Sequence, residues 1–419
     1  MIDIKDLLKN PNKYRDNLKK RNWQEKDIAI IDKIIDLKTE INNLIVQRNH
    51  LKETVNKLSK TKPDNETIDY LRQLKIDLKK IDDSIEAKTS QLNDYLFNLP
   101  NIIASDVPLG KSEKDNLVIK QWGDIKKTDH QYDHIFLGKK YDILDIDRAA
   151  KIAGSRFYYF KNDLVLLEFS LINFVFDFLK NFDFIPIIPP FFIREKYYKG
   201  MGRLAADQKE ERYYLPKDDL YLIGSAEHTI GPYYADEVLS EKELPKRFLG
   251  FSSCFRREAG SYGKDVKGIL RTHQFDKLEM FSFTLPEQSE TEHQFLLSLQ
   301  EKIMQALKLP YRVVLICSGD IGFTDYKQYD IEAWIPSQNR YRETHSCSNT
   351  TDFQARGVNA RFRRRSGKIE FIHTLNATAV AIGRIIIAIL ENYQKDNYIE
   401  IPEVLQPYMR KDKIVPPAK

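Results

Sequence analysis

The chain has 419 residues, of which 42% are hydrophobic and 30% charged, and its formal net charge is +5. This length exceeds what one hydrophobic core usually organises, so two or three domains are expected. The small positive charge neither requires nor excludes a nucleic-acid partner. The densest basic cluster, RFRRR at 361–365, is by itself typical of a solvated surface.

Cysteine usage and hydropathy indicate the compartment. The three cysteines, Cys254, Cys317 and Cys347, form no CxxC pair, and their odd number argues against a disulfide framework. The start, MIDIKDLLKN, has no apolar signal-peptide core, and the apolar run TAVAIGRIIIAIL is too short for a bilayer and contains Arg384. We therefore expect a soluble protein of the reducing cytoplasm, with no membrane partner.

The first hundred residues show a heptad pattern. Apolar residues recur every seven positions in two runs, with Arg48 in one seam position: Leu37, Leu44, Leu51 and Leu58, then Leu71, Leu78, Ile85, Leu92 and Leu99. TKPDNET at 61–67 has the composition of a turn between them. The pattern predicts an antiparallel helical hairpin with arms at about 27–60 and 67–99. By itself it fits a dimerisation or spacer coiled coil as well as an arm that reaches toward RNA.

From about residue 101 the pattern changes to short β-rich runs broken by Pro and Gly. Strands are predicted at 183–193, 247–255, 277–284, 312–319 and 328–336, and helices at 163–182 and 292–307. The strands cluster without βαβ alternation, which favours an antiparallel sheet flanked by helices. The expected class is α+β, with a domain at 1–100 and a second at 101–419.

Familiar nucleotide and metal motifs are missing from the sequence. It has no GxGxxG after a strand, no GxxxxGK[ST], no HExxH and no Cys/His cluster with zinc spacing. Any nucleotide would have to be held by arginines and acids on the sheet, and no zinc is expected.

The segment FRREAGSYGKDVKGILRTHQFDKLEM offers such side chains. Arg256 ends one predicted strand, and Phe275 and Glu279 lie on the next, so all three could converge on one ligand. The planar fork of Arg256 suits a phosphate or carboxylate, and Phe275 offers an aromatic face for a base. The alternative for Arg256 and Glu258 is a surface ion pair of little energetic value.

Two later segments add polar candidates. YRETHSCSN places Glu343 in a hydroxyl-rich strand, where an acid could help to hold Mg²⁺, and Glu332 is a second acidic candidate that can equally lie on the outer face. HTLNATAVAIGRIIIAILENYQ is typical of a strand entering a helix, with Asn376 and Thr378 expected at the transition. Arg384 in this apolar helix needs an anionic partner, such as a ligand phosphate, or a path to the surface.

The N-terminal hairpin, the Arg256 segment and these two segments together resemble a seryl-tRNA synthetase of the bacterial or eukaryotic type, a class II aminoacyl-tRNA synthetase. NFDFIPIIPPFFI resembles the first class motif, a dimer-interface element ending at Pro190. The resemblance implies a six- or seven-stranded antiparallel sheet and a homodimer. It also implies activation of L-serine by ATP and Mg²⁺, followed by transfer to tRNA-Ser and, where present, tRNA-Sec. The hairpin would grasp the tRNA.

The resemblance also implies residue roles. Arg256, Glu279 and Arg384 would be catalytic. The serine pocket would contain Ser225, Ala226, Glu227, Arg256, Glu279, Asn376 and Thr378. The ATP site would contain Arg256, Arg257, Glu258, Thr272, His273, Gln274, Phe275, Glu343, Thr344, His345, Ser346 and Arg384. Glu343 and Ser346 would hold Mg²⁺. Of the paired arginines, Arg256 is the one expected to act, with Arg257 facing away, and the glycines and lysines between Arg256 and Phe275 would meet the tRNA acceptor end.

Some positions depart from the family pattern. Ser225 replaces a usual threonine, HTLNAT replaces HTLNGS, and His345 replaces a usual serine, where a supporting or surface role is expected for it. Two other functions remain open: a ligase that loads a carrier protein, which tends to lack the hairpin, and a non-catalytic paralogue, which would lose the nucleotide-handling arginines and acids.

Overall fold

The computed structural model describes residues 1–60, 64–125, 132–205, 208–259 and 267–417. The chain divides into two compact units, residues 2–100 and residues 101–419, with Met1 counted in the second. None of the helices in the described ranges is long and apolar enough to cross a membrane.

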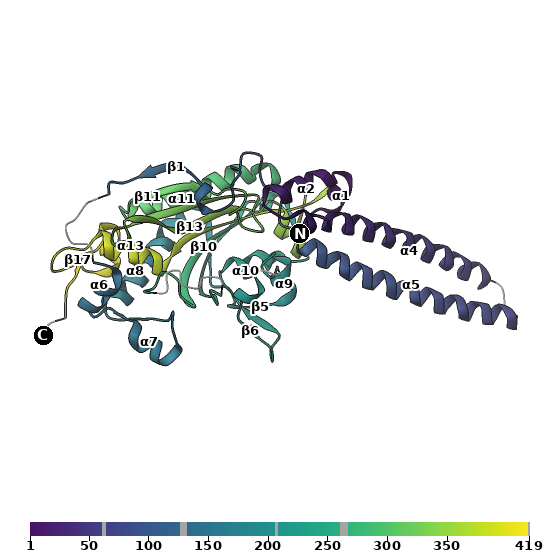
Figure 1. Cartoon of the computed structure of the whole chain (residues 1–419), viewed down its shortest axis with the longest axis horizontal. Coiled ribbons are helices and arrows are strands. Elements are labelled where there is room, and N and C mark those ends of the chain that lie inside the picture. Colours follow the sequence, from purple (N-terminus) through teal and green to yellow (C-terminus); the bar gives the residue numbers. More distant parts are fainter. Residues whose placement is uncertain (61–63, 126–131, 206–207, 260–266, 418–419) are drawn as a thin grey trace. The chain divides into compact units, whose positions relative to one another are not determined.

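The N-terminal unit is helical throughout. Three short helices, α1 (Ile4–Lys9), α2 (Pro11–Lys20) and α3 (Glu25–Ile28), precede two long ones, α4 (Ile30–Leu58) and α5 (Asn65–Phe97), which run side by side (Figure 1). An ion pair of 3.6 Å between Arg48 and Asp82 joins α4 to α5, and Asp64 caps α5 by accepting the Thr67 N–H at 2.8 Å. The predicted antiparallel coiled coil is confirmed.

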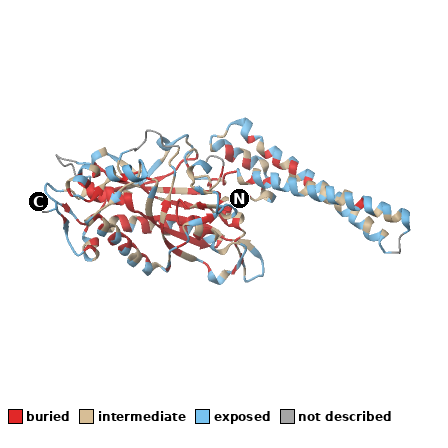
Figure 2. Cartoon of the chain, turned by 90° about the horizontal axis from the view of Figure 1, so that it is seen from below, coloured by how far each residue is buried: buried red, intermediate tan, exposed pale blue. Residues whose placement is uncertain are grey.

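Burial along α4 and α5 explains why the heptads are needed. Ile34, Leu37 and Ile41 are buried, whereas Leu44, Leu51 and Leu58 are only half-buried, and much of the rest of both helices is exposed (Figure 2). A two-helix seam cannot enclose its side chains, so the seam residues give the hairpin its register and only a modest share of stability.

The second unit is built on one eight-stranded sheet, so the expected α+β class is confirmed. Its strands, in spatial order, are β1 (Leu117–Trp122), β11 (Tyr311–Leu315), β12 (Lys327–Ile335), β13 (Arg340–Asn349), β16 (His373–Ala381), β10 (Gln274–Thr284), β9 (Lys246–Phe255) and β4 (Phe184–Ile187). Every neighbouring pair is antiparallel except β4 and β9, which are parallel. The implied six or seven strands were therefore too few, and the predicted strand at 183–193 is split, because Pro189 and Pro190 lie between β4 and β5 (Phe192–Arg194).

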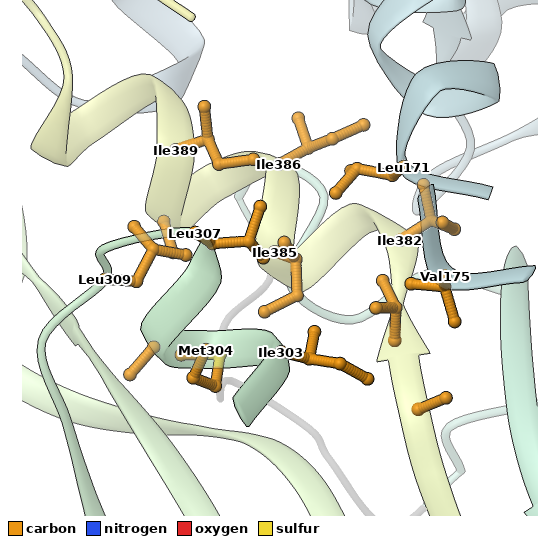
Figure 3. Packing of buried hydrophobic residues seen from close by; sticks show 14 of the residues in the cluster. Leu171, Val175, Ile303, Met304, Leu307, Leu309, Ile382, Ile385, Ile386 and Ile389 are labelled. Atoms are coloured by element: carbon orange, nitrogen blue, oxygen red, sulfur yellow. The ribbon is translucent and has the colours of Figure 1, made fainter. Parts of the chain in front are cut away.

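Three helices cover the sheet and build the core: α8 (Asp163–Leu179), α11 (Ser289–Ala306) and α13 (Ile382–Asn392). Ile385, Ile386 and Ile389 of α13 are fully or almost fully buried. Figure 3 shows them with Leu171 of α8 and Met304 of α11 in one cluster. This packing holds the start of α13, where β16 ends, in one place. The strand-to-helix transition therefore falls at Ala381, and Asn376 and Thr378 lie within β16 rather than at the transition.

Smaller elements surround this core. The remaining helices are α6 (His134–Lys140), α7 (Ile146–Ala153), α9 (Glu195–Gly200), α10 (Glu227–Ile230), α12 (Phe353–Val358) and α14 (Gln406–Met409). The remaining strands are β2 (Leu144–Asp145), β3 (Tyr159–Phe160), β6 (Tyr214–Leu215), β7 (Leu220–Leu222), β8 (Val238–Ser240), β14 (Arg361–Arg363), β15 (Ile369–Phe371), β17 (Ile399–Glu400) and β18 (Lys413–Ile414).

Helices α9 and α12 approach each other closely through two glycines. A Cβ placed on Gly357 of α12 would collide with the carbonyl oxygen of Gly200 of α9. Backbones come this near only where both residues lack side chains.

Candidate active site

The candidate site lies where β9 ends and β10 begins. Phe255 pairs with Gln274 in the ladder, and Arg256 follows directly after β9. Two cavities lie here, of about 90 and 490 Å³, and they share part of their walls. The residues common to both are Arg256, Glu258, Arg271, Lys277, Glu343 and Ser346.

The guanidinium of Arg256 is held in place on this wall. Its Nε and Nη2 donate to the carbonyl oxygen of Gly224 at 3.2 and 3.1 Å, and the group lies over the ring of Phe275 at 5.3 Å. A carbonyl cannot neutralise the positive charge, so Arg256 keeps its attraction for an anionic ligand.

Glu258 has a different partner from the one considered in the sequence. Its carboxylate accepts from Nη1 of Arg271 at 3.3 Å, and Glu258 is mostly buried. Glu258, near the start of the 256–272 segment, is therefore paired with Arg271, near its end. The predicted tRNA-contacting residues Gly260, Gly263 and Lys264 lie outside the described residues.

Glu279 is at the centre of a buried polar group. It is fully buried and accepts hydrogen bonds from Asn376 Nδ2 at 3.3 Å and Thr378 Oγ1 at 3.4 Å, and Nζ of Lys277 lies 2.6 Å from it. Antiparallel register places Glu279 opposite Thr378. Burial raises the pKa of Glu279, and Lys277 opposes that rise.

Three buried polar atoms of residues that line the larger cavity have no hydrogen-bond partner among the described residues: Nε of Arg203, the hydroxyl oxygen of Ser225 and the amide oxygen of Asn376. Buried polar atoms are rarely left in this state, because each costs about 1–3 kcal/mol. The oxygens of Ser225 and Asn376 are therefore suited to bind a polar ligand.

Behind Ser225, the start of α10 carries a charged network. Oε1 of Glu227 lies 2.6 Å from Nη2 of Arg203 and 3.3 Å from Nε2 of His228. Although burial opposes ionisation of Glu227, Arg203 lowers its pKa below the usual range. Burial lowers the pKa of His228 to about 3, so its imidazole is neutral near pH 7.

Glu343 and Arg384 form an ion pair, and both line the smaller cavity. Nη1 of Arg384 lies 3.2 Å from Oε1 of Glu343 and donates to the Glu343 carbonyl oxygen at 3.1 Å. The anionic partner required by Arg384 is thus a side chain of β13. Desolvation opposes ionisation of Glu343, but Arg384, Arg256 and Arg271 lower its pKa.

Glu332, the second acidic candidate, is not part of this site. It pairs with Arg312 on β11 and lines neither cavity.

Most of the predicted residues gather at these two cavities. Thr272, Phe275, Thr344, Thr378 and Arg384 line the smaller cavity, and Ser225, Glu227 and Asn376 line the larger one. Glu279 lies directly behind Asn376 and Thr378.

Besides Glu279, five predicted residues are not on either wall. Ala226 is packed near Gly250, and the His273 ring is 3.0 Å from the Arg256 carbonyl oxygen. Gln274 is exposed at the start of β10, and His345 is buried against Thr344 and Ala379. Arg257 lies over the ring of Tyr213 at 5.2 Å, away from both cavities.

Several wall residues were not identified from the sequence: Arg203, Arg212, Lys277, Asp325 and Gln328. Lys277 could have been found, because the two-residue period of β10 places it on the same face as Phe275 and Glu279. Arg203 and Arg212 belong to an irregular segment before β6, where no periodicity relates a residue to a face.

Glu343 and Ser346 have the donor chemistry that Mg²⁺ requires. An ionised carboxylate and a hydroxyl line the same two cavities, and Mg²⁺ commonly binds one or two protein oxygens together with substrate phosphates. Within the described ranges, no three His, Cys, Asp or Glu side chains gather as a metal site. The residues therefore fit a Mg²⁺ ion that arrives with a phosphate ligand.

Comparison with known proteins gives matches along the whole chain. The model of the seryl-tRNA synthetase N-terminal domain matches residues 1–103, and the model of the class II tRNA synthetase core domain (G, H, P, S and T) matches residues 211–393. The serine–tRNA ligase of Dictyoglomus thermophilum is 43% identical over 99% of this chain and 100% of its own length.

Solved structures agree. The seryl-tRNA synthetase of Pyrococcus horikoshii, complexed with ATP, has a TM-score of 0.92 and 38% identity, covering 100% of both chains. The cytoplasmic serine–tRNA ligase of Naegleria fowleri, in complex with AMP, has a TM-score of 0.86 and 32% identity, covering 98% of this chain and 96% of its own. With its N-terminal helical hairpin and its antiparallel sheet bearing the Arg256 site, the chain belongs to the seryl-tRNA synthetase family.

Proposed function

We propose that the chain is a serine–tRNA ligase that joins L-serine to the 3′ end of tRNA-Ser in two steps. In the first, a carboxylate oxygen of serine attacks the α-phosphorus of ATP, the bond to the bridging oxygen breaks, and pyrophosphate leaves. In the second, a ribose hydroxyl of the tRNA attacks the seryl carbonyl carbon, and AMP leaves. Where an organism has tRNA-Sec, the same reaction would apply to it.

The observation that carries this proposal is the arrangement of charge and unpaired polar atoms at one site. Arg256 and Arg271 supply positive charge for phosphates, while Ser225 and Asn376 hold unpartnered polar atoms on the adjoining wall. A phosphate-binding cavity that shares part of its wall with a polar cavity suits an adenylate of a small polar amino acid.

Each side chain would act mainly by position and charge. Arg256 would bridge the serine carboxylate and the ATP α-phosphate as negative charge develops there, and Phe275 would contact the adenine. Thr378 and Glu279 would bind the serine hydroxyl. Such a site rejects alanine, because alanine has no hydroxyl and would leave these buried polar groups unpaired. Glu343 and Ser346 would hold Mg²⁺, which would neutralise phosphate charge.

The N-terminal unit favours tRNA over a carrier protein as the acceptor. Helices α4 and α5 hold 29 and 33 residues and expose mostly polar side chains. At 1.5 Å per residue they extend about 44 and about 50 Å, which suits a long nucleic-acid surface. The carrier-ligase alternative offers no comparable use for this hairpin.

A homodimer is part of the same proposal. Near the first class motif, α8, β4 and the segment after it expose large apolar side chains: Leu166, Phe169, Ile185, Ile188 and Phe192. Strand β4 is also an edge of the main sheet. Exposed apolar residues beside an open edge strand favour a partner, here a second copy of the chain.

The compartment follows from the substrates. We place the reaction in the cytoplasm, where a reducing environment also suits the three buried free thiols of Cys254, Cys317 and Cys347.

The test is amino-acid-dependent exchange of pyrophosphate into ATP, followed by transfer assays. We expect exchange with serine and not alanine, and charging of tRNA-Ser. Exchange with no amino acid would identify a non-catalytic paralogue. Activation of serine followed by loading of a carrier protein, without tRNA charging, would identify the carrier ligase. Light scattering measures the oligomeric state, and a monomer would exclude the dimer.

A further inference from the structure

A buried histidine outside both cavities contacts the segment that forms one of their walls. His134 is the first residue of α6 and is 4% exposed. Its Nε2 lies 3.3 Å from the backbone nitrogen of Ile269, which donates to it. Its Nδ1 lies 3.1 Å from Oε1 of Glu391, near the end of α13. One imidazole therefore joins three separate parts of the chain.

The hydrogen bonds determine which ring nitrogen carries the proton. The Ile269 N–H can donate only to an unprotonated Nε2, so the proton resides on Nδ1 and is donated to Glu391. The two nitrogens thus have different tasks, since Nδ1 anchors the ring and Nε2 holds the backbone of Ile269.

Glu391 is itself fixed in place. It is 2% exposed, Oε1 also accepts the backbone N–H of His134 at 3.1 Å, and Oε2 accepts the backbone N–H of Ser337 at 3.0 Å. Glu391 lies two turns after Arg384 on α13, the helix whose apolar face packs in the cluster of Figure 3. A rigid helix therefore supports the imidazole.

The segment around Ile269 has little room to move. Gly268 has φ +79°, and a Cβ there would collide with Nε2 of His134. On the other side, a Cβ on Gly383 would lie 3.4 Å from the Ile269 carbonyl oxygen. The backbone at 268–269 thus passes between the imidazole and the first turn of α13.

The residues that follow are part of the nucleotide cavity. Ile269, Leu270, Arg271 and Thr272 all line the smaller cavity. Arg271 also reaches across to Glu258 at 3.3 Å. A shift of the backbone at Ile269 would therefore displace the Arg271 guanidinium relative to Arg256 and Phe275.

We propose that His134 is a positioning residue for ATP binding, which holds the 269–272 wall through Nε2 without touching the nucleotide. This rests on the proposed function, because the smaller cavity is taken as the ATP site. The same geometry makes Glu391 the support of His134.

Two substitutions separate the tasks of the two nitrogens. In H134N the amide can still donate to Glu391, but it is too short to accept from Ile269. In H134Q the amide reaches the Nε2 position and can accept from Ile269. We expect H134N to raise KM for ATP about 10-fold, with a smaller change in KM for serine, and H134Q to restore it to within about 3-fold of the wild type. H134A should behave like H134N or worse.

The matched control is H293Q. His293 is also a fully buried histidine, and its Nε2 lies 2.9 Å from the Cys347 carbonyl oxygen, yet it lines neither cavity. We expect H293Q to lower thermal stability and leave KM for ATP unchanged. Thermal denaturation of all four variants shows whether the change in KM merely follows stability.

The readouts are pyrophosphate exchange and calorimetric binding of ATP. Equal effects of H134N and H134Q, or equal increases in KM for ATP and serine, would overturn the proposal. So would a wild-type affinity for ATP in H134N. If the wild type exchanges with no amino acid, the proposed function fails, and the calorimetric comparison of H134N with H134Q still decides the role of His134. If H134N does not fold, H134Q against H134A gives the same comparison.

Discussion

Arg256 and Arg257 are consecutive in the chain but have different surroundings. Arg256 lies over Phe275 and lines both cavities, whereas Arg257 lies over Tyr213, outside them. The Arg257 backbone N–H donates to the Glu211 carbonyl oxygen at 3.0 Å. Adjacent residues in extended backbone point to opposite sides, which separates one cation from the site.

This contrast gives a matched pair of variants. We expect R256K to lower kcat/KM for pyrophosphate exchange at least 100-fold, because lysine keeps the charge but loses the planar fork that binds two oxygens at once. R257K should change kcat/KM for pyrophosphate exchange less than 5-fold, because Arg257 lines neither cavity.

The measurement is steady-state exchange at varied ATP and serine, with thermal denaturation to verify folding. A comparable loss in R257K would show that the site extends to that side of the strand, contrary to the assignment of Arg256 alone.

At this scale, the predicted residues lie near one another where they belong to strands. Phe275, Glu279, Asn376 and Thr378 occur in β10 and β16, and the ladder register brings these two strands together. Arg203 and Arg212 were not found, since they belong to an irregular segment before β6, in which no periodicity relates a residue to a face. The pairing of Glu258 with Arg271 was also inaccessible, because it spans a loop whose path no local pattern determines.

At the scale of elements, the contact of α9 with α12 is the tightest backbone approach described above. The two helices meet at Gly200 and Gly357, and Val358 is close to the same contact. Any added methyl group must push the helices apart, because the opposing atom is a backbone carbonyl that cannot turn away.

We expect G357A to lower the free energy of unfolding by about 2 kcal/mol, measured by urea denaturation. The control is G367A, at a glycine with φ +87° and open space around it, which should cost about 1 kcal/mol from backbone strain alone. A smaller loss in G357A than in G367A would contradict the steric argument.

Elements were predicted best where a repeat was long. The heptads anticipated α4 and α5 closely, and apolar runs identified α8, α11 and α13. The short strands β2, β3, β6 and β7 have two or three residues each, too few for a period to emerge. The parallel pairing of β4 with β9 depends on tertiary packing, which strand patterns do not encode.

At the scale of the whole molecule, the two units should have separable tasks. We expect a variant in which residues 50–79 are replaced by a short turn to retain serine-dependent exchange within about 2-fold. Its tRNA charging should fall at least 100-fold, because many phosphate contacts would be lost. The cut leaves the Arg48–Asp82 ion pair at the new end, so the helices keep their register.

Parallel exchange and charging assays on one preparation test this division. Equal loss in both assays would show that the hairpin also supports activation, and unchanged charging would show that the acceptor is bound elsewhere.

Buried histidines predict how stability depends on pH. Burial lowers the pKa of His293 and of His345 to about 4, whereas an unfolded histidine titrates near 6.5. Between these values the unfolded chain binds protons that the folded chain does not, so stability falls as the pH falls below about 6.5. At pH 5 each histidine contributes about 2 kcal/mol to this loss.

Buried carboxyls with a raised pKa, such as Asp325, act in the opposite direction, so a variant is needed to isolate one histidine. The free energy of unfolding of H293Q, relative to wild type, should rise by about 2 kcal/mol between pH 7 and pH 5. Urea denaturation at both values measures it. A constant difference would mean that His293 binds its proton equally well in the folded and unfolded chains.

The ion pair between Arg384 and Glu343 has a consequence for ligand selectivity. Arg384 and Glu343 remain paired until a ligand enters. An anion that enters alone must break this ion pair, and the Glu343 carboxylate is then left beside the anion without a positive partner. A phosphate that arrives with a divalent cation meets no such barrier, since the anion takes the guanidinium while the cation takes the carboxylate. Under the proposed function, the pair would therefore favour the metal–nucleotide complex over free nucleotide or free phosphate, because each group of the broken pair regains an opposite charge.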